Sequence, residues 1–125
     1  MPVEVNREDV VAQVTAAFLD YEDALVRNDV DRMASWFWRS SATVRYGVAE
    51  QLYGFDAIEA WRRTAQPVDP GRRLGRTVVT TFGPDAACVN TEFRNRGGSA
   101  VGRQSQVWVR LPEGWQIVSA HVSLA

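Results

Sequence analysis

Apolar residues in the first third of the chain recur at the spacing of one helical stripe. The stripe consists of Val10, Val14, Phe18, Tyr21 and Leu25. Asn6 is placed to cap such a helix at its start. The acidic residues Asp20, Glu22 and Asp23 lie off the stripe. The pattern therefore predicts a long first helix with one apolar side.

Two more helices and a strand are predicted before residue 66. Residues 28–38 (NDVDRMASWFW) are typical of a short helix capped by Asn28 or Asp29. Residues 41–48 (SATVRYGV) alternate as a strand does, and residues 49–54 (AEQLYG) indicate a turn. Residues 55–65 (FDAIEAWRRTA) return to helical spacing.

The periodicity changes from helix to strand after a loop at residues 66–71 that holds two prolines and a glycine. Four strands joined by short turns follow, at residues 76–82, 86–95, 99–111 and 115–124. This order predicts one α+β domain over residues 1–125, with sequential antiparallel strands and the helices gathered on one face. The long strand at 99–111, with its Gly102, favours a strongly curved sheet around a cavity.

Composition narrows the possible partners. The chain has 125 residues and a formal net charge of -1, so its overall charge indicates neither nucleic acid nor a membrane surface as partner. All 14 basic residues are arginine, so an anion site here must use guanidinium. We expect the arginines on and after the third helix to form a solvated face. They are Arg62, Arg63, Arg72, Arg73 and Arg76.

Metal, disulfide and membrane chemistry have few residues to support them. One histidine and one cysteine are too few for an ordinary zinc site, and we expect Cys88 to be a small buried hydrophobe. No apolar run is long enough to span a membrane. We therefore expect a cytoplasmic protein without metal.

Two side chains could carry chemistry, and each has two interpretations. Tyr21 is the one polar group in the apolar stripe, so it is either a core tyrosine bonded to a backbone carbonyl or a proton donor facing a pocket. Arg45 shares one face of its strand with Thr43 and Gly47. It is either a surface arginine or an enclosed one, which would need an internal carboxylate or a ligand as partner.

The last two strands offer further candidates. Arg103 and Ser105 share one face of strand 99–111, and Gln104, Gln106 and Trp108 share the other. His121, in the final strand, is either a structural side chain or a titrating one, because its ordinary pKa lies near neutrality.

Three runs of the sequence resemble the AtzH-like proteins: residues 36–63 (WFWRSSATVRYGVAEQLYGFDAIEAWRR), 102–110 (GRQSQVWVR) and 114–123 (GWQIVSAHVS). These are small members of the NTF2-like superfamily, the cystatin-like cone also used by ketosteroid isomerase and SnoaL-type cyclases. The resemblance implies a curved antiparallel sheet packed on a long N-terminal helix and two shorter helices. It also implies a homo-oligomer, a dimer or tetramer, formed through the sheet.

The resemblance further implies a function. AtzH-like proteins occur beside amidases of ureide, cyanuric acid or oxalurate breakdown, so an amidase is an expected partner. The AtzH member is described as a decarboxylase of 1,3-dicarboxyurea, and a tyrosine on the first helix and an arginine on the first strand are implicated there. Tyr21 and Arg45 occupy those places, as proton donor and carboxylate clamp, with no cofactor required. Arg103, Ser105 and His121 are further candidates for contacts with a small carboxylated ureide or other small anion.

Two other functions stay open. The first is a non-catalytic binding or accessory subunit of a ureide or oxalurate amidase pathway. The second is an isomerase of the ketosteroid type, which needs a carboxylate base that residues 38–41 do not offer. An enclosed cavity that holds both Tyr21 and Arg45 would favour the enzyme, whereas a core carboxylate that neutralises Arg45 would favour the binding subunit.

Overall fold

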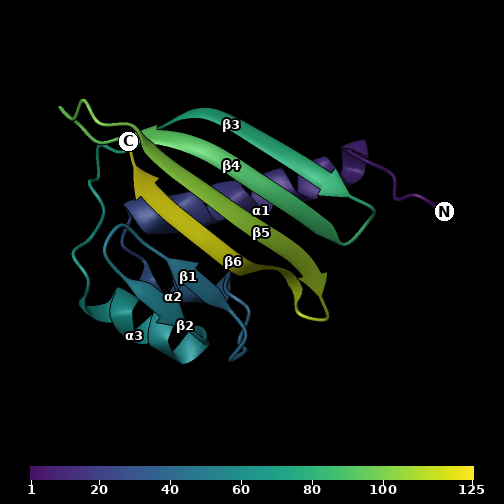
Figure 1. Cartoon of the computed structure of the whole chain (residues 1–125), viewed down its shortest axis with the longest axis horizontal. Helices are drawn as coiled ribbons and strands as arrows, with labels where there is room; N and C mark the ends of the chain where they lie inside the picture. Colours follow the sequence, from purple (N-terminus) through teal and green to yellow (C-terminus); the bar gives the residue numbers. More distant parts are fainter.

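A computed structural model describes residues 1–125 as three helices and a six-stranded sheet (Figure 1). The elements are α1 (Glu8–Val26), α2 (Val30–Ser35), β1 (Val44–Tyr46), β2 (Gln51–Tyr53), α3 (Phe55–Thr64), β3 (Arg73–Phe82), β4 (Ala86–Arg94), β5 (Gly102–Leu111) and β6 (Gly114–Leu124). The predicted order of helices and strands is confirmed with one correction. The segment predicted as a turn contains β2, which pairs antiparallel with β1.

The strand order is β2-β1-β6-β5-β4-β3. Strands β3 to β6 form the predicted antiparallel meander. β1 joins the sheet parallel to β6, so the sheet is mixed at this edge rather than antiparallel throughout. Parallel neighbours need a long connection between them, and here β2, α3 and strands β3 to β5 separate β1 from β6 in the chain.

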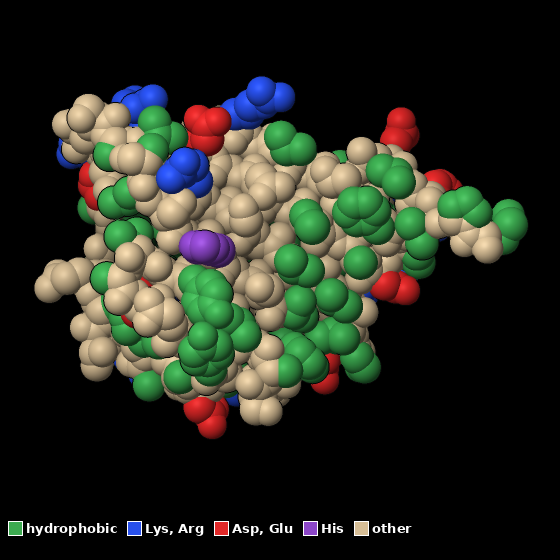
Figure 2. All heavy atoms as spheres, viewed as in Figure 1, with side chains coloured by type: hydrophobic (Ala, Val, Ile, Leu, Met, Phe, Trp, Pro, Cys, Tyr) green, Lys and Arg blue, Asp and Glu red, His purple; other side chains and the backbone are tan.

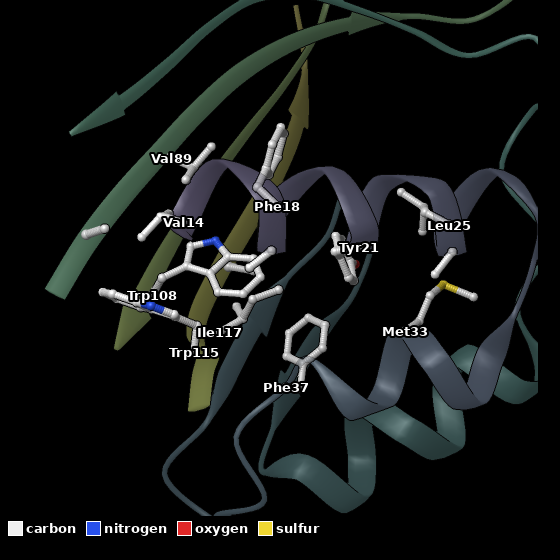
Figure 3. Close-up of a cluster of buried hydrophobic side chains, with 14 of the residues drawn as sticks. Val14, Phe18, Tyr21, Leu25, Met33, Phe37, Val89, Trp108, Trp115 and Ile117 are labelled. Atoms are coloured by element: carbon white, nitrogen blue, oxygen red, sulfur yellow. The ribbon is translucent and has the colours of Figure 1, made fainter. Parts of the chain in front are cut away.

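Helix α1 lies across one face of the sheet, and all five residues of its predicted stripe are buried (Figures 1 and 3). They pack with Trp108 of β5 and Ile117 of β6, which are both fully buried. Asp29 caps α2 as one of the two predicted alternatives, accepting a hydrogen bond from the Arg32 backbone. The prediction that Asn6 caps α1 was wrong. Arg7 occupies the N-cap position, and the side chain of Asn6 accepts a hydrogen bond from the backbone of β3.

The curvature of the sheet has local causes that the sequence did not reveal. The pairing register shifts between Leu74 and Thr77 of β3, and again where β6 pairs with Val107 and Trp108 of β5. Such irregularities bend a strand and increase its twist. Gly102 has another role, because a Cβ atom at this position would overlap the ring of Phe93 on β4. No helix of the structure has the length and apolar character needed to cross a bilayer.

Candidate functional site

Tyr21 and Arg45 line the same cavity, which has a volume of about 320 Å³. The cavity lies between α1, the β1–β2 hairpin, α3 and the segment at residues 66–72, with the ends of β4, β5 and β6 contributing the rest of its wall. Half of its lining residues are hydrophobic. Two side chains that are far apart in the sequence therefore meet the same small space, from a helix and from a strand.

Tyr21 is only 3% exposed, and its ring makes an edge contact with Phe37 at 5.8 Å between centroids. Figure 3 shows it between Phe18 and Leu25 along α1. Arg62 lines the same cavity, and Tyr21 is one of the neighbours that raise the pKa of its guanidinium. The ring is thus fixed by the core while its polar end meets the cavity.

Arg45 is enclosed, with 7% of its surface exposed. Its Nη1 donates a hydrogen bond of 2.7 Å to Glu50 Oε1, and its guanidinium lies 4.5 Å from the ring centroid of Trp61. The backbone N–H of Ala49 donates to the other oxygen of Glu50 at 3.2 Å. A Cβ atom on Gly47 would overlap the Glu50 carboxylate, so glycine leaves the space in which this pair forms.

Arg62 is the residue that sequence reasoning missed. It was expected on a solvated face, but it is partly buried and lines the cavity. Burial lowers the pKa of its guanidinium, the positive charge of Arg45 lowers this pKa further, and the nearby Tyr21 and Glu50 partly oppose the effect. The signal was its position four residues after the buried Ile58, which places both on one side of α3.

The rest of the expected basic patch separates in the structure. Arg63, Arg73 and Arg76 are exposed, as expected. Arg72 is buried, and it pairs with both carboxylate oxygens of Glu22 at 3.2 Å.

The Glu22–Arg72 pair belongs to a buried polar cluster in the cavity wall. Gln104 accepts a hydrogen bond from Arg72 at 3.3 Å and donates one to Glu22 at 3.4 Å. The Arg72 guanidinium also lies 3.8 Å from the ring centroid of Phe93. Glu22 was placed off the apolar stripe, yet it follows Phe18 by four residues and is therefore directed inward with it. The cluster joins α1, the residue before β3, and β5.

Arg103, Ser105 and His121 are not in the cavity, so their expected role as substrate contacts needs correction. All three are exposed on the opposite, outer face of the sheet. Ser105 donates to Asn90 at 2.6 Å, Arg103 donates to the Leu124 carbonyl at 3.3 Å, and His121 contacts Tyr46. In Figure 2 the one histidine appears at the surface beside a group of hydrophobic side chains.

Strand geometry explains this result. Trp108 fills the core, so Gln104 and Gln106 on its face point inward and Arg103 and Ser105 point outward. On β6, the register shift opposite Val107 and Trp108 leaves Val118 as an extra residue. The next buried residue of β6 after Ile117 is therefore Ala120 instead of Ser119. His121, which follows Ala120, lies on the outer face. No three His, Cys, Asp or Glu side chains come together as possible metal ligands.

The chain belongs to the AtzH-like family, whose model matches residues 3–125. No curated protein sequence gives a significant match. The fold is that of NTF2-like, or cystatin-like, proteins.

Two solved structures are similar over nearly the whole chain. A cystatin-like fold protein from Burkholderia xenovorans is 56% identical, with a TM-score of 0.95 over 98% of this chain and 96% of that one. A protein of unknown function from Pectobacterium atrosepticum is 50% identical, with a TM-score of 0.94 over 97% and 94%. A ketosteroid isomerase-like protein from Erwinia carotovora atroseptica shares the fold at 16% identity, with a TM-score of 0.72 over 94% and 98%.

Proposed function

We propose that this protein is a cofactor-free decarboxylase that acts on a small N-carboxylated ureide such as 1,3-dicarboxyurea. One observation carries the proposal: Tyr21 and Arg45, which the AtzH-like sequence pattern brings forward, line a single cavity of about 320 Å³. This volume is at the small end of the range of ligand sites, which suits a ligand of a few heavy atoms.

The reaction requires one proton and one oriented carboxylate. The bond between nitrogen and the departing carboxyl carbon breaks, its electron pair stays on nitrogen, and carbon dioxide leaves. Tyr21 gives its hydroxyl proton to that nitrogen, directly or through water, and solvent then restores the phenol. With 1,3-dicarboxyurea the products are allophanate and carbon dioxide. Arg45 holds the carboxylate that remains, which orients the bond that breaks.

Glu50 fits this scheme as the group that positions Arg45. A guanidinium has five N–H donors, and the Glu50 carboxylate accepts from the Nη1 of Arg45. The contact with Trp61 restrains the same group from another side. Arg45 is therefore fixed in place while it retains further donors for a ligand.

A second function is favoured by the same ion pair. Because a protein carboxylate already meets the charge of Arg45, the chain could act as a non-catalytic ligand-binding or accessory subunit of a ureide or oxalurate amidase pathway. Such a subunit would need the cavity but not proton donation by Tyr21.

An isomerase has less support. The two carboxylates that line the cavity are Glu50 and Asp69, and hydrogen bonds engage both oxygens of each. Both carboxylates therefore hold structural partners in place, Arg45 and the backbone of the cavity wall.

The outer face of the sheet supports the expected homo-oligomer. Several large apolar side chains are exposed there, on strands β1, β3 and β5 (Figure 2). They include Tyr46, Val78 and Val107. We propose that a second copy of the chain covers this face, and sedimentation velocity would show a dimer or tetramer if it does.

The deciding experiment measures carbon dioxide release from 1,3-dicarboxyurea that a coupled amidase generates in place. Release faster than the spontaneous rate, in proportion to the amount of protein added, is the expected result. Release at the spontaneous rate would overturn the decarboxylase and favour the accessory subunit, which a pull-down with ureide-pathway amidases would then test.

A further inference from the structure

Arg62 differs from the other arginines of the cavity in having no carboxylate partner. Arg45 pairs with Glu50 at 2.7 Å, and Arg72 pairs with Glu22 at 3.2 Å. Arg62 makes no ion pair within 4.0 Å.

Asp69, the remaining acidic residue of the lining, forms no ion pair with Arg62. Its oxygens accept hydrogen bonds from the backbone N–H groups of Gly71 and Arg96, at 2.8 and 2.6 Å. With Glu22 counted, three arginines and three carboxylates balance formally, but Arg62 is the one guanidinium of the cavity that no carboxylate contacts directly.

The position of Arg62 is built rather than incidental. Its guanidinium lies 4.7 Å from the ring centroid of Trp61, and Arg45 lies 4.5 Å from the same centroid. The indole therefore holds two like charges near each other, and each contact fixes a guanidinium against an aromatic ring. A partly buried guanidinium that is repelled by its neighbour gains strongly from an anion placed beside it.

We propose that Arg62 is a ligand-binding residue that receives a carboxylate at the point where the Tyr21 hydroxyl also meets the cavity. The site takes small planar amides or ureides that carry at least one carboxylate, and it rejects their uncharged counterparts. The inference rests on the proposed function for the kind of ligand, and it extends that function. Arg45 and Arg62 become two arms for the two ends of a dicarboxylated ureide, with Arg62 on the side of the proton donor.

Rejection of uncharged ligands follows from the positive charge of Arg62. A neutral ligand would fill the cavity and remove water from Arg62 while offering it no negative partner. A carboxylate would offer two oxygens to the planar fork of the guanidinium, in the geometry that arginine recognises best. The preference for the charged ligand is therefore a direct measure of what Arg62 does.

The test uses oxamate, a planar amide with one carboxylate, and oxamide, which carries a second amide in its place. Calorimetric titration would compare the wild type with Arg62→Gln and Arg62→Lys. The matched control is Arg63→Gln, because Arg63 is the next residue of α3 but is exposed and pairs with Asp31. Thermal melting of each variant checks that it folds.

We expect the wild type to bind oxamate in preference to oxamide. Arg62→Gln should weaken oxamate binding about tenfold or more and remove the preference. The oxamate affinity of Arg62→Lys should lie between those of the wild type and Arg62→Gln, since lysine keeps the charge but loses the planar fork. Arg63→Gln should stay within about twofold of the wild type, because exposed ion pairs contribute little.

Equal oxamate affinity in Arg62→Gln and the wild type would overturn the inference, and so would a wild type that does not bind oxamate. If Arg62→Gln does not fold, Arg62→Lys decides by the same criterion. The outcome is separable from that of the proposed function. Oxamate binding that depends on Arg62, without carbon dioxide release, would keep the anion site and remove the decarboxylase. Carbon dioxide release that is the same in Arg62→Gln and the wild type would keep the decarboxylase and remove the anion site at Arg62.

Discussion

Arg45 on β1 donates a hydrogen bond of 2.7 Å to Glu50, which directly precedes β2, so one ion pair joins β1 to the turn of the β1–β2 hairpin. The arginine side chain is 8% exposed and the glutamate side chain 22%. The pair brings a guanidinium to the cavity already held by a carboxylate, whereas Arg62 reaches the same cavity without one.

Replacing Tyr21 by phenylalanine should remove the proton donor and leave the fold intact. The ring keeps its edge contact with Phe37, and only the hydroxyl group at the cavity is lost. General acid catalysis is worth a factor of about 100 or more, so carbon dioxide release should fall by at least that much. Tyr46→Phe is the control, because Tyr46 is exposed on the outer face. A Tyr21→Phe variant that keeps the wild-type rate would exclude Tyr21 as the donor.

Replacing Arg45 by alanine should mainly prevent ligand binding. It also leaves Glu50 without its partner in a partly buried place, which should cost about 1–3 kcal/mol of unfolding free energy. Titration with malonate, a small dicarboxylate that offers a group to each arginine, and denaturation in urea measure the two effects. Arg39→Ala is a suitable control, since Arg39 is exposed and packs over Phe55 outside this cavity. Unchanged malonate affinity in Arg45→Ala would contradict its role as a clamp.

Glu22 and Asp23 are neighbouring carboxylates on α1 with opposite surroundings, which makes them a matched pair for a stability experiment. Glu22→Ala leaves the buried guanidinium of Arg72 unpaired, which should cost about 3–5 kcal/mol of unfolding free energy. Asp23→Ala removes exposed contacts to Arg27 and Arg32, so its effect should be much smaller. Equal midpoints of urea denaturation for the two variants would show that the buried cluster does not stabilise the fold.

Asp69 should give the stability of the protein a dependence on acid pH. Backbone hydrogen bonds from Gly71 and then Arg96 hold the pKa of this carboxyl group below its usual value of 3.8. Its contribution is therefore complete above about pH 4 and is lost as the pH falls through the lower pKa of the folded state. The difference in unfolding free energy between the wild type and Asp69→Asn should shrink as the pH falls below 4.

The control for this experiment is Glu113→Gln, which changes an exposed carboxylate in the β5–β6 turn. The difference in unfolding free energy between the wild type and Glu113→Gln should not shrink in this way as the pH falls below 4. A difference between the wild type and Asp69→Asn that stays constant down to pH 2 would show that Asp69 does not anchor this segment.

The inner side of α1 was predictable from sequence because a helix repeats with a fixed period. The five residues of the stripe indicated which side of α1 is buried, and Tyr21 points inward because it belongs to that stripe. In the same way, alternation on β1 placed Arg45 and Thr43 on one face, although it did not say which face the core would cover. The antiparallel meander could be predicted because its turns are short and local.

The three site candidates that lie on the outer face of the sheet show what a local sequence pattern cannot predict. Alternation on β5 separated Arg103 and Ser105 from Gln104, but only packing against α1 decided that the glutamine side faces inward. One extra residue in β6 reversed the alternation before His121. Such a bulge depends on how two strands align, and neither strand carries a clear signal of it.

The sequence by itself determined all the helices and strands except β2, the family resemblance, and Tyr21 and Arg45 as the first candidates for the site. The tertiary structure alone decided the electrostatics of that site. Glu22 and Arg72 are 50 positions apart, and their pairing exists only because the chain returns to α1 after α3. Whether a guanidinium is paired, as in Arg45 and Arg72, or has no carboxylate partner, as in Arg62, depends on which carboxylates lie within a few ångströms. Periodicity and residue type carry no information about that distance.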